Sequence, residues 1–89
     1  MPFVKKKLKV KNKQGLHARP AALFVQVANR FESNITVSRD QEKVNGKSIM
    51  GILMLGAEQG SEIILEVDGK DADSALVELE RIVDKEDDL

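Results

Sequence analysis

The sequence predicts an α+β domain, in which helices cover one face of an antiparallel sheet. Three segments show the two-residue alternation of apolar and polar side chains that marks a half-buried strand, and a fourth, shorter segment follows a hairpin turn. Two longer segments repeat their apolar residues with the helical period of about 3.6. The resulting order is β-α-β-β-(α)-β-α. A chain of 89 residues supplies one core of this kind, so we expect a single domain over residues 1–89.

The first predicted strand covers residues 3 to 10. Val4, Leu8 and Val10 alternate there with lysines, and only Lys6 breaks the pattern. Lysines on a strand at the edge of a sheet discourage pairing with other chains. We therefore expect this strand to lie at an edge.

An amphipathic helix is predicted from about Ala18 to Phe31. Its apolar residues recur at steps of three and four, and they are Ala21, Phe24, Val27, Ala28 and Phe31. Pro20 is tolerated only in the first turn, where backbone N–H groups have no intrahelical acceptor. The helix should therefore begin near His17 or Ala18.

The middle of the chain predicts a hairpin and then a short element of uncertain type. Ile35 and Val37 belong to a strand, which turns at residues 40–42 and returns at residues 43–46. Ser48 then precedes an apolar run that fits either a strand or a short helix capped by this serine.

The last strand and helix have clear periods. Ile63, Leu65 and Val67 alternate with more polar residues as a strand. A helix then begins at Lys70 or Asp71 and continues to about residue 83. Its apolar residues are Ala72, Ala75, Leu76, Leu79, Ile82 and Val83.

Composition excludes several classes of function. The chain has no cysteine, which rules out disulfides and thiolate chemistry. One histidine with scattered carboxylates makes a poor metal site, so we expect no metal and no other cofactor. Three phenylalanines without tyrosine or tryptophan form no stacking platform for nucleic acid. No apolar run approaches the roughly 18 residues of a membrane span, and the first residues lack the apolar stretch of a secretory signal, so we expect a cytoplasmic protein.

The net charge of −1 hides an uneven distribution of charged residues. Residues 1–30 contain eight basic residues and no acidic ones, whereas residues 61–89 contain three basic and eleven acidic residues. Unless the fold brings the two ends together, the first third presents a basic surface that attracts phosphate or acidic partners.

His17 lies at the expected start of the first helix, after Gly15 and two residues before Arg19. Free backbone N–H groups at such a position bind anions, and the helix dipole adds about 0.3–1 kcal/mol for an exposed negative charge. A guanidinium can donate two hydrogen bonds to a phosphate, and neutral imidazole is a nucleophile. A phosphate-bearing role is therefore as well supported as the alternative, in which His17 only caps the helix.

Two segments resemble those of one known family. The run Gly15-Leu16-His17-Ala18-Arg19-Pro20-Ala21 resembles the active-site signature of HPr, the histidine-containing phosphocarrier family of the bacterial phosphoenolpyruvate:sugar phosphotransferase system. The run Lys47-Ser48-Ile49-Met50-Gly51-Ile52 resembles the regulatory serine segment of the same family. The resemblance implies an HPr-like open-faced β-sandwich, a four-stranded antiparallel sheet covered on one face by three helices (βαββαβα).

The resemblance also implies the roles of the residues around His17. This histidine would accept a phosphoryl group at Nδ1 from Enzyme I and donate it to the IIA domains of sugar permeases. Arg19 and the backbone N–H groups of Ala18 and Arg19 would hold the phosphoryl oxygens, while Gly15 and Pro20 would keep the turn in place. The protein would be a stoichiometric carrier and not an enzyme.

Regulation and docking are implied around Ser48. HPr kinase/phosphorylase phosphorylates this serine in relatives with the Lys-Ser-Ile-Met-Gly sequence, and the added charge would impair docking of Enzyme I. A short surface helix cannot bury all of its apolar residues, so we expect an exposed patch. The resemblance implies that its exposed members, Ile49, Met50 and Leu53, dock Enzyme I, the kinase and the IIA domains. A catabolite-control transcription regulator is a further partner to test for the phosphoserine form. We expect a monomer that binds neither nucleic acid nor a membrane.

Two alternatives stay open at this point. A paralogue that serves a nitrogen-related relay shares the histidine signature, and the Ser48 segment favours the carbon system without deciding the matter. A regulatory domain that carries no phosphate could act through its docking patch alone, although non-carrier relatives in the family replace the histidine.

Overall fold

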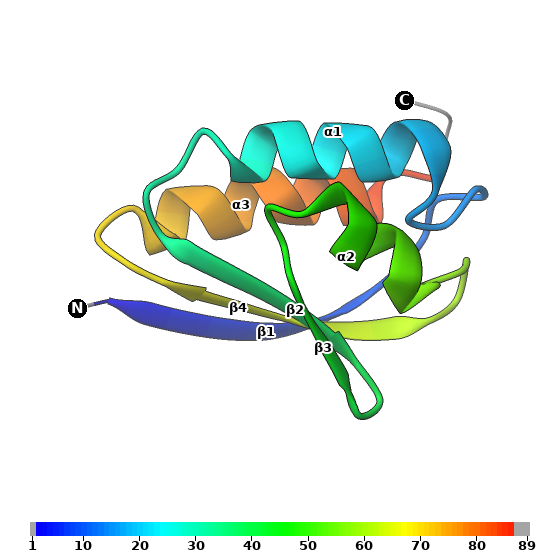
Figure 1. The fold of residues 1–89 in the computed structure, drawn as a ribbon, viewed down its shortest axis with the longest axis horizontal. Coiled ribbons are helices and arrows are strands. Elements are labelled where there is room, and N and C mark those ends of the chain that lie inside the picture. Colours follow the sequence, from blue (N-terminus) through cyan, green and yellow to red (C-terminus); the bar gives the residue numbers. More distant parts are fainter. Residues whose placement is uncertain (1, 87–89) are drawn as a thin grey trace.

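The computed structural model describes residues 2–86, and the predicted order of elements is confirmed there. The apolar run after Ser48 is a helix. The elements are shown in Figure 1 and have the following bounds: β1 (Phe3–Lys9), α1 (Ala18–Ala28), β2 (Asn34–Arg39), β3 (Glu42–Asn45), α2 (Ile49–Leu55), β4 (Glu62–Asp68) and α3 (Ala72–Asp84).

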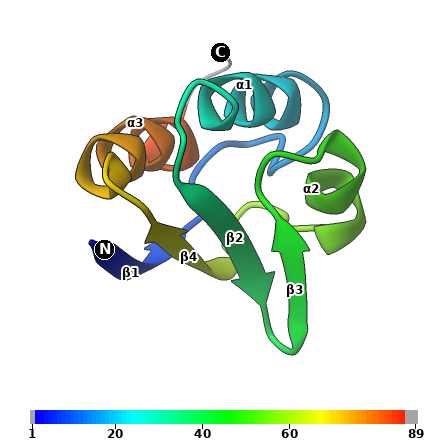
Figure 2. The same ribbon diagram turned by 60° about the vertical axis from the view of Figure 1, so that its left-hand side comes forward.

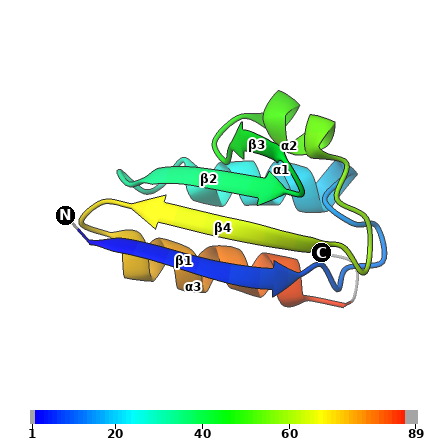
Figure 3. The ribbon, with the colours of Figure 1, turned by 90° about the horizontal axis from the view of Figure 1, so that it is seen from below.

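The strands form one antiparallel sheet in the order β1-β4-β2-β3. β1 therefore lies at an edge, as its lysines predict. The helices lie together on one face of this sheet, where α3 packs on β1 and β4, α2 packs on β3, and α1 contacts both other helices (Figure 2). Within residues 2–86, no helix lies on the opposite face (Figure 3). The predicted open-faced β-sandwich is confirmed.

The core lies between the sheet and the helices. Phe24 of α1, Leu65 of β4 and Leu79 of α3 are fully buried. Burial of side chains of this size contributes about 1.5–3 kcal/mol each, so apolar contacts between the two layers dominate the stability. Leu16 and Ala57, which belong to loops, are also fully buried, and they bring the segment before α1 against the segment after α2.

The first helix is shorter than predicted. It ends at Ala28, and the side-chain amide of Asn29, the C-cap residue, donates to the carbonyl of Val25. Arg30 and Phe31 follow in a tighter turn, in which the N–H of Phe31 donates to the carbonyl of Ala28, three residues earlier. Phe31 still packs against the core, so its apolar period continues beyond the helix.

The hairpin differs from the prediction by one residue at each end. Asp40 has a positive φ of 55°, which allows a tight turn over residues 40–41 and leaves Glu42 in β3 opposite Arg39. The return strand ends at Asn45 instead of Gly46. At Gly46 the N–H donates to the carbonyl of Ile35, and an added Cβ would lie 2.5 Å from that side chain.

Two details of α3 also differ from the sequence pattern. Leu76 is only partly buried, although it follows the helical period. Asp71 precedes the helix, but its carboxylate makes no capping bond within α3. It accepts hydrogen bonds instead from the N–H of Glu32 at 2.9 Å and from the N–H and hydroxyl groups of Ser33. Asp71 thus joins the start of α3 to the loop before β2.

The fold brings the basic and acidic ends of the chain together. Antiparallel pairing places Lys5 opposite Glu66 and Lys9 opposite Glu62 on the uncovered face of the sheet. On the other side of β1, Nζ of Lys6 lies 2.8 Å from a carboxylate oxygen of Glu80 in α3. The exception stated for the basic surface therefore applies along β1, because its lysines face the acidic last third of the chain.

Candidate functional site

His17 is the residue immediately before α1, and its backbone is extended, with φ −128° and ψ 165°. Its side chain makes no capping hydrogen bond to the helix. The alternative in which His17 only caps α1 therefore loses its structural basis. His17 is only half-buried, so part of this residue is open to a partner protein.

The backbone directly after His17 is strained. Ala18 has a φ of 49°, in the left-handed region that costs a residue with a Cβ about 1–2 kcal/mol. Pro20, which is buried, then continues the first turn of α1. Such strain is kept only where the surrounding structure enforces it, and it gathers at functional sites. The sequence pattern gave no indication of this strain.

The loop before His17 is held by close backbone contacts. The N–H of Gly15 donates to the carbonyl of Asn12 at 3.0 Å, and the N–H of Leu16 donates to the carbonyl of Ala57 at 2.8 Å. Gly15 has a φ of 69°, and a Cβ added there would lie 2.6 Å from the Ala57 oxygen and 2.8 Å from Cα of Glu58. Only glycine fits this position, which explains Gly15 beyond its expected role as a turn residue.

Asn12 is a site residue that sequence analysis missed. It is buried, and its side-chain oxygen accepts the N–H of Gln14 at 2.9 Å, which closes the turn. An asparagine two residues before such an N–H is typical of an Asx turn, so the pattern Asn12-Lys13-Gln14-Gly15 could have indicated it. The segment from Asn12 to Leu16 is thus fixed before it reaches His17.

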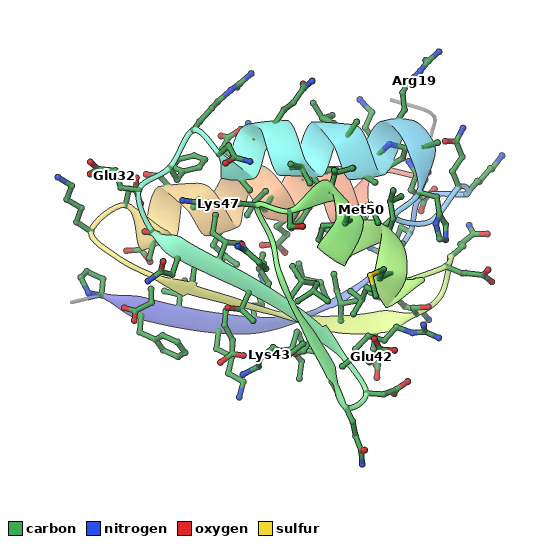
Figure 4. The ribbon with its side chains drawn as sticks, viewed as in Figure 1. Arg19, Glu32, Glu42, Lys43, Lys47 and Met50 are labelled. Carbon is green, nitrogen blue, oxygen red and sulfur yellow. The ribbon has the colours of Figure 1, made fainter. Side chains whose placement is uncertain are left out.

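Arg19 and His17 lie at the same end of α1. Arg19 is exposed, and its side chain extends from the first turn of the helix away from the sheet (Figure 4). The two residues of the sequence-predicted pair therefore share one end of α1. This end of α1 also holds backbone N–H groups that have no acceptor within the helix.

Ser48 caps α2, as its position in the sequence predicts. Its hydroxyl oxygen accepts the N–H of Gly51 at 3.0 Å. The helix packs closely on β3, because a Cβ at Gly51 would lie 3.2 Å from both the Asn45 oxygen and Cβ of Val44. Gly51 therefore permits the contact between α2 and the sheet.

The outer face of α2 carries an exposed apolar surface, here called the α2 patch. Its residues and exposed fractions are Ile49 (41%), Met50 (63%), Leu53 (39%) and Met54 (68%). Ile52 and Leu55 point into the core from the other side of the helix. Met54 was not predicted, although its position four residues after Met50 places both on one helix face.

Two further contacts hold α2 against its neighbours. Nη1 of Arg39 in β2 donates to the carbonyls of Leu55 at 3.0 Å and Gly56 at 3.1 Å, at the end of the helix. At the other end, Nζ of Lys47 donates to the carbonyl of Phe31 at 2.7 Å, close to the end of α1 (Figure 4). Neither contact has a sequence pattern that could have indicated it.

The α2 patch and His17 lie on the same side of the molecule. The N–H of Leu16, which precedes His17, donates a hydrogen bond to the carbonyl of Ala57, and Ala57 lies only two residues after the end of α2. The first turn of α1 and the body of α2 are also side by side in Figures 1 and 2. One partner could therefore contact the patch and the imidazole together.

Metal and membrane sites are not found in the described part of the chain. Within residues 2–86 no group of three or more histidine, cysteine, aspartate or glutamate side chains could hold a metal ion. The helices described in the same range are too short or too polar to cross a membrane.

Comparisons with known proteins identify the family of this chain. Residues 4–85 match the family model described as the PTS HPr component phosphorylation site. Over 84 residues, which are 94% of this chain and the whole of the relative, the sequence is 51% identical to the HPr-like protein Crh of Halalkalibacterium halodurans. It is also 51% identical over 80 residues to the phosphocarrier protein HPr of Treponema pallidum, covering 90% of this chain and 91% of that protein.

Solved structures have the same fold. The crystal structure of the phosphocarrier protein HPr from Bacillus anthracis superimposes with a TM-score of 0.89 at 49% identity, over 91% of this chain and 96% of that one. A crystal structure of Crh from Bacillus subtilis, described as a swapped, intertwined dimer, has a TM-score of 0.74 at 46% identity, over 97% of this chain and 99% of that one. With a family model that matches 4–85 and relatives that match along nearly their full length, this chain belongs to the HPr family.

Proposed function

We propose that this protein is a phosphoryl carrier of the phosphoenolpyruvate:sugar phosphotransferase system. Phospho-Enzyme I would donate a phosphoryl group to Nδ1 of His17, and the IIA domains of sugar permeases would accept it. The observation that best supports this proposal is the position of His17, which directly precedes α1, is only half-buried and makes no side-chain capping bond, two residues before the exposed Arg19. We infer that residues 4–85, which match the family model, form one carrier domain. This domain would accept and pass on one phosphoryl group at a time and would not be an enzyme.

The transfer is a substitution at phosphorus between two histidines. The lone pair of His17 Nδ1 forms the new N–P bond while the N–P bond to the donor imidazole breaks, and that imidazole keeps the electron pair. Little covalent chemistry is left to the protein, so position and charge compensation provide the catalysis. The guanidinium of Arg19 and the backbone N–H groups of Ala18 and Arg19 would hold the phosphoryl oxygens.

Docking would use the α2 patch. Its four apolar side chains are exposed, and exposed apolar surfaces of this kind mark interaction sites. Ile49, Met50 and Leu53 are the residues implied by the family resemblance, and the structure adds Met54 to the same surface.

Ser48 would regulate this docking. HPr kinase/phosphorylase would phosphorylate the hydroxyl that now caps α2, and the phosphate would bring a charge of about −1.5 to −2 to the edge of the α2 patch. The negative charge suits the start of a helix, so α2 would persist while acidic partner surfaces would be repelled.

The decisive experiment is phosphoryl transfer with purified components. The protein is incubated with phosphoenolpyruvate and Enzyme I, and its intact mass is measured before and after mild acid. We expect one acid-labile phosphoryl group in the wild type, none in His17→Ala and slower transfer in Arg19→Ala. Absence of the group from the wild type, with a known carrier reacting in the same tube, would contradict the proposal.

A regulatory docking domain is the second candidate. It is favoured by the high identity to two proteins named HPr-like protein Crh, at 51% and 48%. Such a role needs the α2 patch and Ser48 but not His17. Failure of phosphoryl transfer together with phosphorylation of Ser48 by the kinase would support it. Transfer only from the Enzyme I of a nitrogen-related relay would assign the protein to that branch instead.

We also propose that the carrier works as a monomer. The lysines along β1 make this edge a poor partner for another strand. Because structures of relatives include dimers, light scattering after size-exclusion chromatography is the relevant test. A stable dimer that transfers phosphoryl groups would contradict the proposal that the carrier works as a monomer.

A further inference from the structure

Two methionines dominate the α2 patch. Met54 and Met50 are 68% and 63% exposed, which are the highest values among the exposed large apolar residues of the described chain. They are four residues apart and therefore on one face of α2. The whole sequence contains three methionines and no cysteine, so no thiol in the protein would consume an oxidant before these thioethers.

We propose that the α2 patch is an oxidation-sensitive docking surface. A hydroperoxide converts Met50 and Met54 to methionine sulfoxides, which weakens docking until a thiol-dependent reductase restores the thioethers. This inference rests on the proposed carrier function, because it concerns the surface that would receive Enzyme I.

Oxidation of the methionines and their repair are both two-electron reactions at sulfur. A sulfur lone pair attacks one peroxide oxygen, the O–O bond breaks, and water or an alcohol leaves. The sulfur is oxidised by two electrons and the peroxide is reduced by two. In the reverse reaction two thiols supply two electrons, so that a thioether, a disulfide and one water are formed.

The fold should survive this oxidation. The residues that anchor α2 are on its other side or at its ends: Ile52 and Leu55 are fully buried, and Arg39 holds the final carbonyls. Ser48 caps the start of the helix independently of the methionines. A sulfoxide oxygen on the exposed face stays in water in the free protein, so it imposes no desolvation cost there.

Oxidation of the two methionines should weaken docking of Enzyme I. A sulfoxide oxygen is a strong acceptor, and an apolar partner surface leaves it without a donor once water is excluded. Two such groups among four patch residues should raise the KM of Enzyme I for this protein by roughly tenfold or more. The turnover at saturation should change little, because His17 and Arg19 lie at the start of α1 and not on α2.

The test compares the wild type with Met50→Leu/Met54→Leu. Leucine has nearly the same apolar volume as methionine, but it has no sulfur atom that peroxide could oxidise. Each protein is treated with hydrogen peroxide, which catalase then removes, and peptide mapping measures oxidation at each methionine. KM and kcat with Enzyme I, and Tm, are compared with those of the same protein before treatment. A third sample receives methionine sulfoxide reductases A and B with dithiothreitol.

We expect treatment to raise KM only in the wild type, with Tm unchanged, and the reductases to restore KM. An unchanged KM after full oxidation of both residues would overturn the inference, as would an equal rise in the double variant or protection of both residues from peroxide. An untreated wild type that accepts no phosphoryl group overturns the proposed function first, and the inference with it.

Discussion

Substitution of Gly15 by alanine tests the contact that positions His17. The new Cβ would lie 2.6 Å from the Ala57 oxygen, and the φ of 69° disfavours any residue with a Cβ. The left-handed backbone costs about 1–2 kcal/mol, and a clash in a packed region adds about 1–3 kcal/mol. We therefore expect Gly15→Ala to lower the free energy of unfolding by about 2–5 kcal/mol.

Gly56→Ala provides a matched control. Gly56 has nearly the same φ, 65°, but an added Cβ would have its nearest neighbour 3.6 Å away, at Nη1 of Arg39. This substitution should therefore cost only the backbone strain of about 1–2 kcal/mol. The free energies of unfolding of both variants are compared by urea unfolding, which requires that the variants have equal m-values.

Transfer kinetics give a second measurement on the same variants. The clash in Gly15→Ala would separate the loop from Ala57, lengthen the Leu16–Ala57 hydrogen bond and move His17. Because a displacement of about 1 Å can cost about a hundredfold in rate, transfer from Enzyme I should slow by at least about tenfold. Equal destabilisation by the two alanines, or normal transfer by Gly15→Ala, would refute the reasoning.

Three other changes test contacts described above. Ser48→Ala removes the capping bond of α2 and should cost about 1 kcal/mol in urea unfolding, besides abolishing phosphorylation by the kinase. Arg39→Ala leaves the last carbonyls of α2 without their donor and should cost about 1 kcal/mol, with partial recovery in Arg39→Lys, measured in the same way. Hydrogen bonds from the Ser33 hydroxyl and the backbone N–H of Glu32 lower the pKa of Asp71. The stabilising effect of the Asp71 carboxylate is therefore fully present above the unfolded-state pKa of about 3.9 and is lost as pH falls through the lower, folded-state pKa. The Tm deficit of Asp71→Asn at pH 7 should therefore shrink as the pH is lowered below about 3.9 in calorimetry.

The sequence predicts most of the fold because its information is local. The alternation in β4 and the helical repeat in α3 identify those elements directly, and Pro20 locates the start of α1. The end of α1 could not be predicted in this way. The apolar period runs on to Phe31, whereas the helix ends at Ala28, before the C-cap residue Asn29.

The site is predicted only in part, for a related reason. His17, Arg19 and Ser48 belong to short motifs, so their positions can be recognised in a linear sequence. Arg39 and Asp71 act on segments that are distant along the chain, and such contacts leave no periodic pattern. The charge distribution shows the same limit, because the pairing of β1 with β4 depends on the whole topology.

The position of β1 in the sheet has a consequence for synthesis of the protein. Among the described residues its one neighbouring strand is β4, which begins at Glu62, 53 residues after β1 ends at Lys9. At translation rates of about 5–20 residues per second, the ribosome finishes β1 roughly 3–11 seconds before it begins β4. During that interval β1 is a nascent strand without its partner. Its lysines then act as gatekeepers against aggregation, before there is a folded sheet whose edge they could protect.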